Sequence, residues 1–294
     1  MEDVEDLGEL LCDLDQFPTI PDLALRIIRA LEDPEVDLDQ VAEWIEREPV
    51  LAARVVRLAR SPMFGALGPD GSLRRAILLL GTSETRRVVL SVAIMNCLPE
   101  LPAPLSVVSF WTLGLGTALA ARHLAQDLKY GNPEWAYLAG LVHSLGEAYL
   151  AVRFTPRYQQ AIEHALERRA PFETTIAQEF GINHPSICAE ILRCWSFPEA
   201  IAEAVEFHLE PDCAPNQRSL ASLVFVADRV CRDLGLGPVD PSHVPRIWVD
   251  EIPADLFERI EGLGYPDVEI YLQEQADVLS GVTELARSLF SAAS

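Results

Sequence analysis

Apolar residues recur every three to four positions along almost the whole chain, which is the spacing of one face of an α-helix. Asp37 is a predicted N-cap, because its side chain can accept a hydrogen bond from the first turn of the next helix. The turn residues GPDG interrupt the pattern at 68–71, and Gly81 is a predicted helix stop. In this first part of the chain the predicted helices span residues 23–31, 38–47, 51–58, 73–80 and 82–97.

A proline-rich connector, PELPAP at residues 99–104, follows these helices, because proline cannot continue a helix and restricts the residue before it. No alternation of apolar and polar residues with a period of two is long enough to predict a strand. The pattern therefore predicts an all-α fold. Beyond the connector the predicted helices span residues 105–129, 134–152, 155–168, 171–180, 185–195, 198–208 and 218–234.

Four parts of the chain follow from these breaks. We predict an acidic N-terminal helix at residues 1–16, an N-terminal helical lobe at 17–104, a helical core at 105–235 and an acidic extension at 236–294. Glycine and proline punctuate the start of the extension, and one amphipathic helix is predicted from residue 266 to about 290. The architecture is thus a two-lobed helical bundle with a C-terminal helical extension.

Charge changes this picture less than the totals suggest. The 294 residues hold 45 Asp and Glu against 23 Lys and Arg, and 49% of them are hydrophobic, which excludes an acidic disordered chain. Such acidity argues against general nucleic-acid binding, which needs clustered basic residues. However, residues 17–235 hold 27 acidic and 20 basic residues, so most of the negative charge belongs to the two ends.

The compartment is predicted from cysteines and from apolar segments. Six scattered cysteines form no Cys-x-x-Cys pair, and the acidic start is the reverse of a positively charged signal peptide. The most apolar stretch, residues 88–98, is far shorter than the roughly 20 residues of a membrane span. We therefore expect a cytoplasmic protein without membrane insertion, and the excess of arginine over lysine favours a bacterial source with a GC-rich genome.

Candidate chemistry lies in the second half. His143, His184, His208 and Asp228 each lie in or beside a different predicted helix, and helical bundles build metal sites by bringing such side chains together. Spacing alone favours separate polar residues near helix ends, each bonded to backbone or water. The sequence leaves both interpretations open.

Several motifs follow one another in a fixed order along the chain. They are the opening FPTIPDLALRIIRALEDPEVDLDQVAEWIEREPVLAARVVRLA, then SLRRAILLLGTSETRRVVL, LAGLVHSLGEAYL, GINHPSICAEILRCWSFPEAIAEAVEFH and LVFVAD. Together these motifs resemble the HDOD family, a regulatory branch of the HD phosphohydrolase superfamily. The resemblance runs from about residue 17 to 234. It implies that residues 105–235 form an HD-like helical core and that residues 17–104 form the additional lobe of HDOD proteins.

The same resemblance implies a degenerate metal site. HD hydrolases bind metal through a first His, a His-Asp doublet and a late Asp; here Leu113 stands at the first position and the doublet is His143-Ser144. The late Asp is retained as Asp228, and His184 and His208 match additional histidine ligands. We therefore expect no cofactor; the alternative is a single divalent ion, Zn, Mn or Fe, held by the three imidazoles and Asp228.

Arginines are concentrated in the first lobe. Arg54, Arg57 and Arg60 recur at helical spacing, and Arg74 and Arg75 follow in the next segment. Such a stripe is either a solvated face or a surface that receives carboxylate or phosphate groups. We predict a protein contact, for which the acidic tail of this chain is one candidate.

These features predict a non-catalytic signalling or regulatory protein that binds a protein partner or a small signalling ligand. The alternative is a metal-dependent phosphohydrolase with an altered ligand set.

Overall fold

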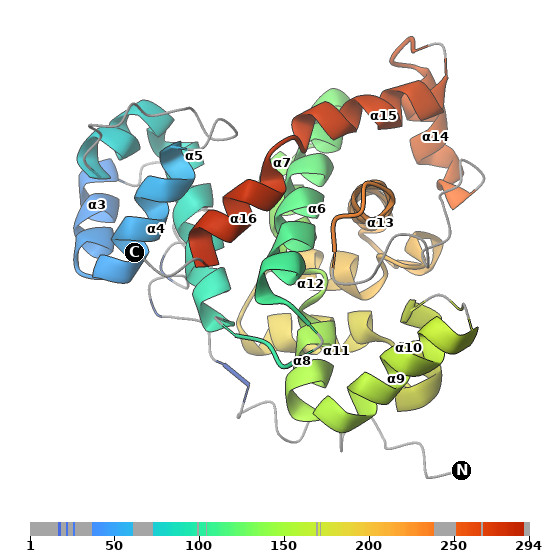
Figure 1. Cartoon of the computed structure of the whole chain (residues 1–294). Helices are drawn as coiled ribbons and strands as arrows, with labels where there is room; N and C mark the ends of the chain where they lie inside the picture. The colour runs from blue at the N-terminus through green and yellow to red at the C-terminus, as the bar shows by residue number, and fades with distance from the viewer. Residues whose placement is uncertain are drawn as a thin grey trace. The chain divides into compact units, whose positions relative to one another are not determined.

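The computed structural model describes residues 17–18, 22, 26, 37–60, 73–98, 100–103, 105–168, 170, 172–237, 251–265 and 267–290 (Figure 1). These residues form helices, turns and connecting segments and no strand, so the predicted all-α class is confirmed. Three predicted features, the helix at 1–16, the stripe at 23–31 apart from residue 26, and the turn at 68–71, lie outside the described residues. Among the described helices, none is both long and apolar enough to span a membrane.

The chain divides into two compact units, which we describe separately. One unit comprises Phe17 and residues 100–280, and the other comprises residues 18–99 and those from 281 onward. Residues 236–294, predicted to form one extension, are therefore shared between the two units.

In the smaller unit, a kinked helix packs against two shorter ones, and a third short helix packs against one of these. The predicted cap of α3 (Leu38–Glu46) is present, since the Asp39 N–H donates to the Asp37 carboxylate at 3.0 Å. Helix α5 (Leu73–Cys97) bends at Gly81, whose φ of +73° only glycine adopts without strain. Helix α4 (Pro49–Arg60) packs against α3, α5 and α16 (Val282–Phe290).

The larger unit is built around α6 (Val107–Asp127), which is buried along most of its length. A helix that is apolar on all sides must be covered on all sides. Helices α7 (Pro133–Val142) and α13 (Arg218–Asp233) pack along it, as Figure 1 shows for α7.

The other helices of this unit surround that centre. Helix α11 packs against α8 and α12, α10 packs against α9, and α12 and α13 are in contact. The elements are α8 (Leu145–Arg153), α9 (Thr155–Arg168), α10 (Phe172–Phe180), α11 (His184–Cys194), α12 (Glu199–Glu206), the short 3₁₀ helix η3 (Pro211–Cys213), α14 (Ala254–Glu261) and α15 (Val268–Val278).

Two long predicted helices are wrong. Residues 134–152 form α7 and α8, which are separated at His143 and Ser144. The His143 Nδ1–H donates to the Gly140 carbonyl at 2.7 Å, so a side chain satisfies an acceptor that a continuing helix would bond through its backbone. The predicted helix at 266–290 also divides, into α15 and α16, at Gly281 with a φ of +85°.

Candidate functional site

The four candidate ligands lie together inside the larger unit. His143 ends α7, His184 begins α11, His208 follows α12, and Asp228 lies in α13. The His208 ring lies 5.3 Å from the His143 ring and 5.5 Å from the His184 ring, between centroids. His143 Nε2 lies 3.0 Å from Asp228 Oδ1. The structure therefore brings all four residues to one point.

The rings of His143 and His208 are each oriented by a hydrogen bond to a backbone carbonyl three residues earlier in the chain. His143 Nδ1 donates to the Gly140 carbonyl at 2.7 Å, and His208 Nδ1 donates to the Val205 carbonyl at 2.6 Å. A carbonyl oxygen only accepts, so both Nδ1 atoms carry a proton and both rings direct Nε2 into the cluster. Among the described residues, the buried Nε2 atoms of His184 and His208 have no hydrogen-bond partner.

Asp228 is held from two sides. The Arg232 Nε–H contacts both carboxylate oxygens of Asp228 at 2.9 Å, one helical turn further along α13. Burial by itself raises the pKa of Asp228, but the Arg232 charge and the hydrogen bond with His143 hold it well below its usual range. Asp228 is therefore an ionised carboxylate.

Arg232 joins this pair to two further acidic residues. Its Nη1 lies 3.3 Å from Glu173 Oε1, and Glu147 lies close enough to act on its charge. Burial lowers the pKa of Arg232, but Asp228, Glu173 and Glu147 together raise it above the usual value. Burial raises the pKa of Glu147, whose Oε1 accepts a 2.8 Å hydrogen bond from Tyr158. Sequence reasoning missed Arg232, Glu147, Glu173 and Tyr158.

His184 and His208 are neutral imidazoles. Burial is the main cause that lowers the pKa of His184 well below its usual value and that of His208 to about 3. Neutral imidazoles are suitable ligands for zinc. In the described part of the chain, however, no group of three or more His, Cys, Asp or Glu side chains is placed so that it could hold a metal ion.

The structure also describes Leu113 and Ser144, the two positions at which the resemblance leads one to expect a metal ligand. Leu113 is fully buried on α6 and has no polar side-chain atom. Ser144 lies between α7 and α8, and its hydroxyl lies 2.8 Å from His143 Nε2. The hydroxyl thus contacts the imidazole nitrogen that a metal would use.

A family model for the HDOD domain matches residues 17–211, about two thirds of the chain. The chain belongs to the HDOD family. The resemblance seen in the sequence is therefore confirmed, and the buried cluster is part of an HDOD protein.

Three similar proteins show how far this similarity reaches. An HDOD domain protein of unknown function from Geobacter sulfurreducens is 28% identical, with a TM-score of 0.82 over 98% of this chain and 100% of that one. A provisionally named signal transduction protein from Marinobacter aquaeolei VT8 is 22% identical, with a TM-score of 0.75 over 96% of this chain and 61% of that one, which shows the fold alone. An uncharacterized protein of Treponema pallidum (strain Nichols) is 24% identical over 79% of this chain, and the chain spans only 45% of its length.

The candidate partner-binding arginines of this HDOD protein lie in the smaller unit. Arg57 Nη1 donates to the Ser288 carbonyl of α16 at 2.7 Å, and the Arg54 guanidinium lies 5.0 Å from the centre of the Phe290 ring. Arg54 also bonds the Asn96 side chain. Helix α16 from the acidic tail therefore contacts two of the arginines, through a carbonyl and an aromatic ring.

The other three arginines of that set are exposed. Arg74 lies 3.4 Å from Glu46 and 3.9 Å from Asp39, and its side chain is 58% exposed. Arg60 and Arg75 are also on the surface. Partner binding by these arginines stays a prediction.

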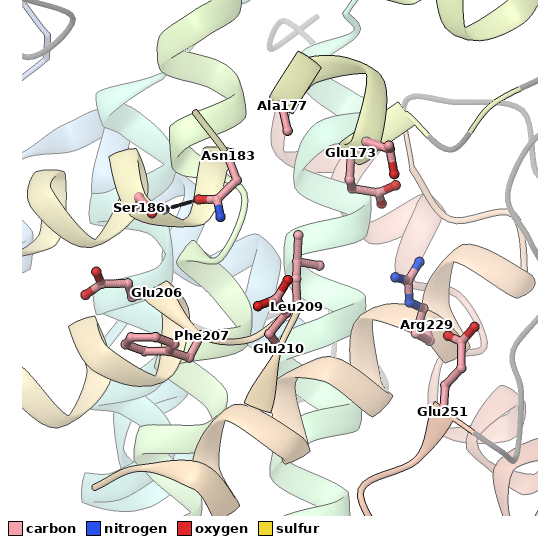
Figure 2. A pocket seen from close by; sticks show the side chains of 11 residues that line it. Glu173, Ala177, Asn183, Ser186, Glu206, Phe207, Leu209, Glu210, Arg229 and Glu251 are labelled. Carbon is pink, nitrogen blue, oxygen red and sulfur yellow. Dashed lines mark hydrogen bonds between the residues drawn. The ribbon is translucent and has the colours of Figure 1, made fainter. Parts of the chain in front are cut away.

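A cavity of about 470 Å³ opens beside α10, α11, α12 and α13 of the larger unit (Figure 2). Glu173, which faces Arg232, is one of its lining residues, and Arg229 lies across from Glu173. The cavity therefore reaches a residue that contacts the buried cluster. Its remaining lining residues are Thr174, Ala177, Asn183, Ser186, Glu206, Phe207, Leu209, Glu210 and Glu251.

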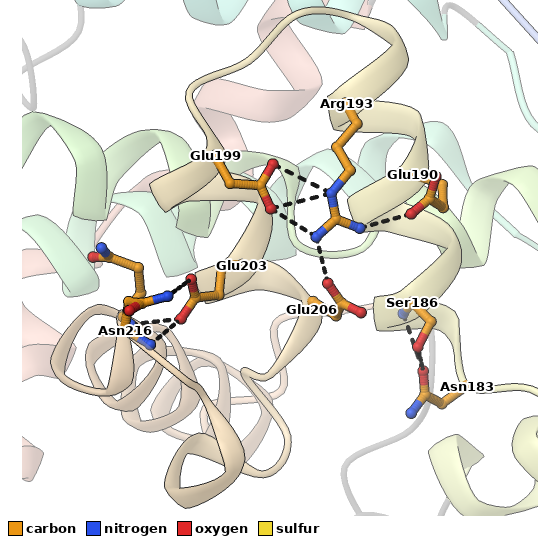
Figure 3. A network of polar contacts seen from close by, with 9 residues as sticks. Asn183, Ser186, Glu190, Arg193, Glu199, Glu203, Glu206 and Asn216 are labelled. Carbon is orange, nitrogen blue, oxygen red and sulfur yellow. Dashed lines mark hydrogen bonds and ion pairs between the residues drawn. The ribbon is translucent and has the colours of Figure 1, made fainter.

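An ion-pair network fixes one side of this cavity (Figure 3). Arg193 of α11 contacts Glu190, Glu199 and Glu206 at 2.7, 2.9 and 2.6 Å, which joins α11 to α12. Glu203 of α12 accepts a hydrogen bond from the backbone N–H of Gln217 at 2.7 Å, just before α13 begins. The helices that carry His184, His208 and Asp228 are thereby tied to one another.

Proposed function

We propose that this protein is a regulatory HDOD protein without a hydrolytic centre, which acts by binding a protein partner or a small signalling ligand. The name of the similar Marinobacter protein agrees with a role in signalling. Fold and function are separable, so the proposal depends on the residues of the cluster.

The observation that carries the proposal is the burial of the cluster. The exposed fractions are 0% for His143 and His208, 1% for Asp228 and 3% for His184. A catalytic group must come within about 3 Å of the reacting atoms or act through a water. Side chains sealed to this degree cannot themselves contact a phosphate ester in solution, whereas they can hold together the four helices in or beside which they lie, α7, α11, α12 and α13.

The cavity in Figure 2 is the proposed binding surface. Its volume of about 470 Å³ suits a small ligand or one side chain of a partner, and it is lined by charged, polar and aromatic groups. Since Glu173 both lines the cavity and faces Arg232, an occupant would act on the buried cluster through that carboxylate.

Hydrolysis assays test the first half of the proposal. The purified protein is incubated with a phosphate monoester and a phosphodiester in the presence of Mn(II), Fe(II) or Zn(II), beside an Asp228→Ala variant. We expect equal background rates for both proteins. Metal-dependent turnover that Asp228→Ala abolishes and that Arg74→Ala retains would refute the proposal.

Site-directed cross-linking tests the second half. A photoreactive residue at exposed Thr174, which lines the cavity, is compared with one at exposed Val50 of the smaller unit in the cells that make the protein. We expect a defined adduct at position 174 alone, and its loss when Arg229→Glu reverses a charge in the cavity. An adduct pattern that Arg229→Glu leaves unchanged would contradict binding in the cavity.

One observation favours the alternative, a metal-dependent phosphohydrolase with an altered ligand set. The Nε2 atoms of His184 and His208 are buried and, within the described residues, have no hydrogen-bond partner. Elemental analysis of the purified protein distinguishes the two functions. Stoichiometric metal that is lost in His208→Ala supports the alternative, and metal-free protein that remains inactive after metal is added contradicts it.

A further inference from the structure

Arg232 is a fixed cation in the middle of a buried acidic cluster. Its side chain is 4% exposed, and three carboxylates raise its pKa: those of Asp228, Glu173 and Glu147. Each of these lies on a different helix: α13, α10 and α8. A buried carboxylate is costly unless a positive group lies beside it, so this guanidinium allows Asp228 to be ionised in the interior.

The contacts of Arg232 engage the carboxylate that a metal ion would need. The Nε–H contacts both oxygens of Asp228 at 2.9 Å, and His143 Nε2 lies 3.0 Å from one of them. Asp228 is the single carboxylate of the candidate set, and a hard divalent cation is bound through charged oxygen. A guanidinium has five donors, but those of Arg232 are directed at carboxylates, Nε at Asp228 and Nη1 at Glu173, and none bonds the Nε2 of His184 or His208.

His184 and His208 each have a buried ring nitrogen that Arg232 does not bond. His184 and His208 are 3% and 0% exposed, and the described residues supply no partner for either Nε2. A lone pair directed into a buried cluster suits a metal ion or a hydrogen-bond donor, and the N–H groups of Arg232 that contact Asp228 and Glu173 do not reach either lone pair.

We infer that Arg232 takes the place of a metal ion: its guanidinium neutralises Asp228 and excludes a divalent cation, and a small neutral residue at position 232 converts the cluster into a metal-binding site. The expected ligands in that variant are Asp228 and the imidazoles of His143, His184 and His208. The inference concerns what holds the cluster together, and it does not depend on the proposed regulatory function.

Cobalt titration tests it, because Co(II) bound by nitrogen and oxygen ligands absorbs visible light. We expect Arg232→Ala to bind about one equivalent of Co(II) per chain and the wild-type protein to bind none. Arg229→Ala, which removes the neighbouring arginine of the same helix, is the matched control and should bind none. Adding His184→Ala to Arg232→Ala should abolish the absorption band.

Thermal unfolding provides a second measurement on the same variants. Zn(II) at about 100 times its Kd should raise the Tm of Arg232→Ala by roughly 5–10 °C and leave the wild-type value unchanged. If Arg232→Ala does not fold alone, it is refolded from urea with and without Zn(II). Recovery with Zn(II) that His184→Ala prevents supports the inference, and refolding that is indifferent to Zn(II) overturns it.

Two results separate this inference from the proposed function. Wild-type protein that is inactive but holds a metal lost on His184→Ala overturns the role of Arg232 and leaves the regulatory function standing. Wild-type protein that hydrolyses a phosphate ester without bound metal overturns the regulatory function and leaves the role of Arg232 standing. A folded Arg232→Ala variant that binds no metal also overturns the inference.

Discussion

Gly146 determines how closely two helices of the site approach each other. It lies in the first turn of α8, directly after the His143-Ser144 break, and faces the start of α11. A Cβ atom at this position would lie 2.0 Å from the His184 carbonyl oxygen and 2.9 Å from the Cys188 backbone nitrogen. Gly146→Ala therefore forces the two helices apart or tilts one of them.

The cost follows from these distances. A carbon atom and a carbonyl oxygen rarely approach closer than 3.0 Å, so α11 must move by at least 1 Å against a packed neighbour. Overpacking of this kind costs about 3 kcal/mol, the upper end of the usual range. Alanine recovers about 1 kcal/mol because glycine is a poor helix residue. The net loss is about 2 kcal/mol, and the displacement moves His184 away from His208.

Urea denaturation followed by far-ultraviolet circular dichroism measures this loss. With an m-value of about 2 kcal/mol/M, the midpoint should fall by about 1 M. Gly131→Ala is the matched control: no atom lies within 4 Å of its added Cβ and its φ is not positive, so stability should change by less than about 0.5 kcal/mol. A Gly146→Ala midpoint equal to that of Gly131→Ala would refute the close approach.

Three further predictions concern pH, ion pairing and thiol reactivity. In the unfolded chain the His208 imidazole becomes protonated below about pH 6.5, whereas in the folded chain burial lowers its pKa to about 3, so the free energy of unfolding should fall as the pH drops through this window. His208→Gln should reduce the slope of the urea midpoint plotted against pH. Parallel plots for the wild type and the variant would contradict this. Arg193→Ala should cost about 1 kcal/mol in urea denaturation, because its three ion pairs are partly exposed, and its loss should be halved in 1 M NaCl. Burial raises the pKa of Cys188 to about 12, so at pH 8 iodoacetamide should modify the exposed Cys194 on the order of 100-fold faster than Cys188, as measured by peptide mass spectrometry. Equal rates for the two cysteines in the folded protein would contradict this. In urea, where both thiols are exposed, equal rates are expected.

Helix positions were predictable where local signals determine them. The predicted helix at 155–168 coincides with α9, and the Asp37 cap and the Gly81 bend are present. Both depend on residues within one turn. The division between α7 and α8 was missed, because it has no glycine or proline and is stabilised by the His143 side chain bonding back to Gly140.

The site was predicted in part, and the reason is again physical. The resemblance to HDOD proteins selected His143, His184, His208 and Asp228, and the fold brings them together. The sequence did not indicate that the cluster is closed to solvent. Burial of a polar side chain depends on which helices cover it, and that depends on contacts between distant segments.

A signal for Arg232 was nevertheless present in the sequence. In α13, Ala221, Val224 and Phe225 begin an apolar stripe that Asp228 and Arg232 continue at the same helical spacing. An acid and a base four residues apart usually form an exposed pair, but a pair placed within an apolar stripe must enter the interior. Either charge alone would be prohibitively costly there, whereas the two together are tolerated. The position of Asp228 and Arg232 within this apolar stripe therefore predicts that both are buried. The same pair links the retained aspartate of the HDOD core to the arginine that we infer excludes a metal ion.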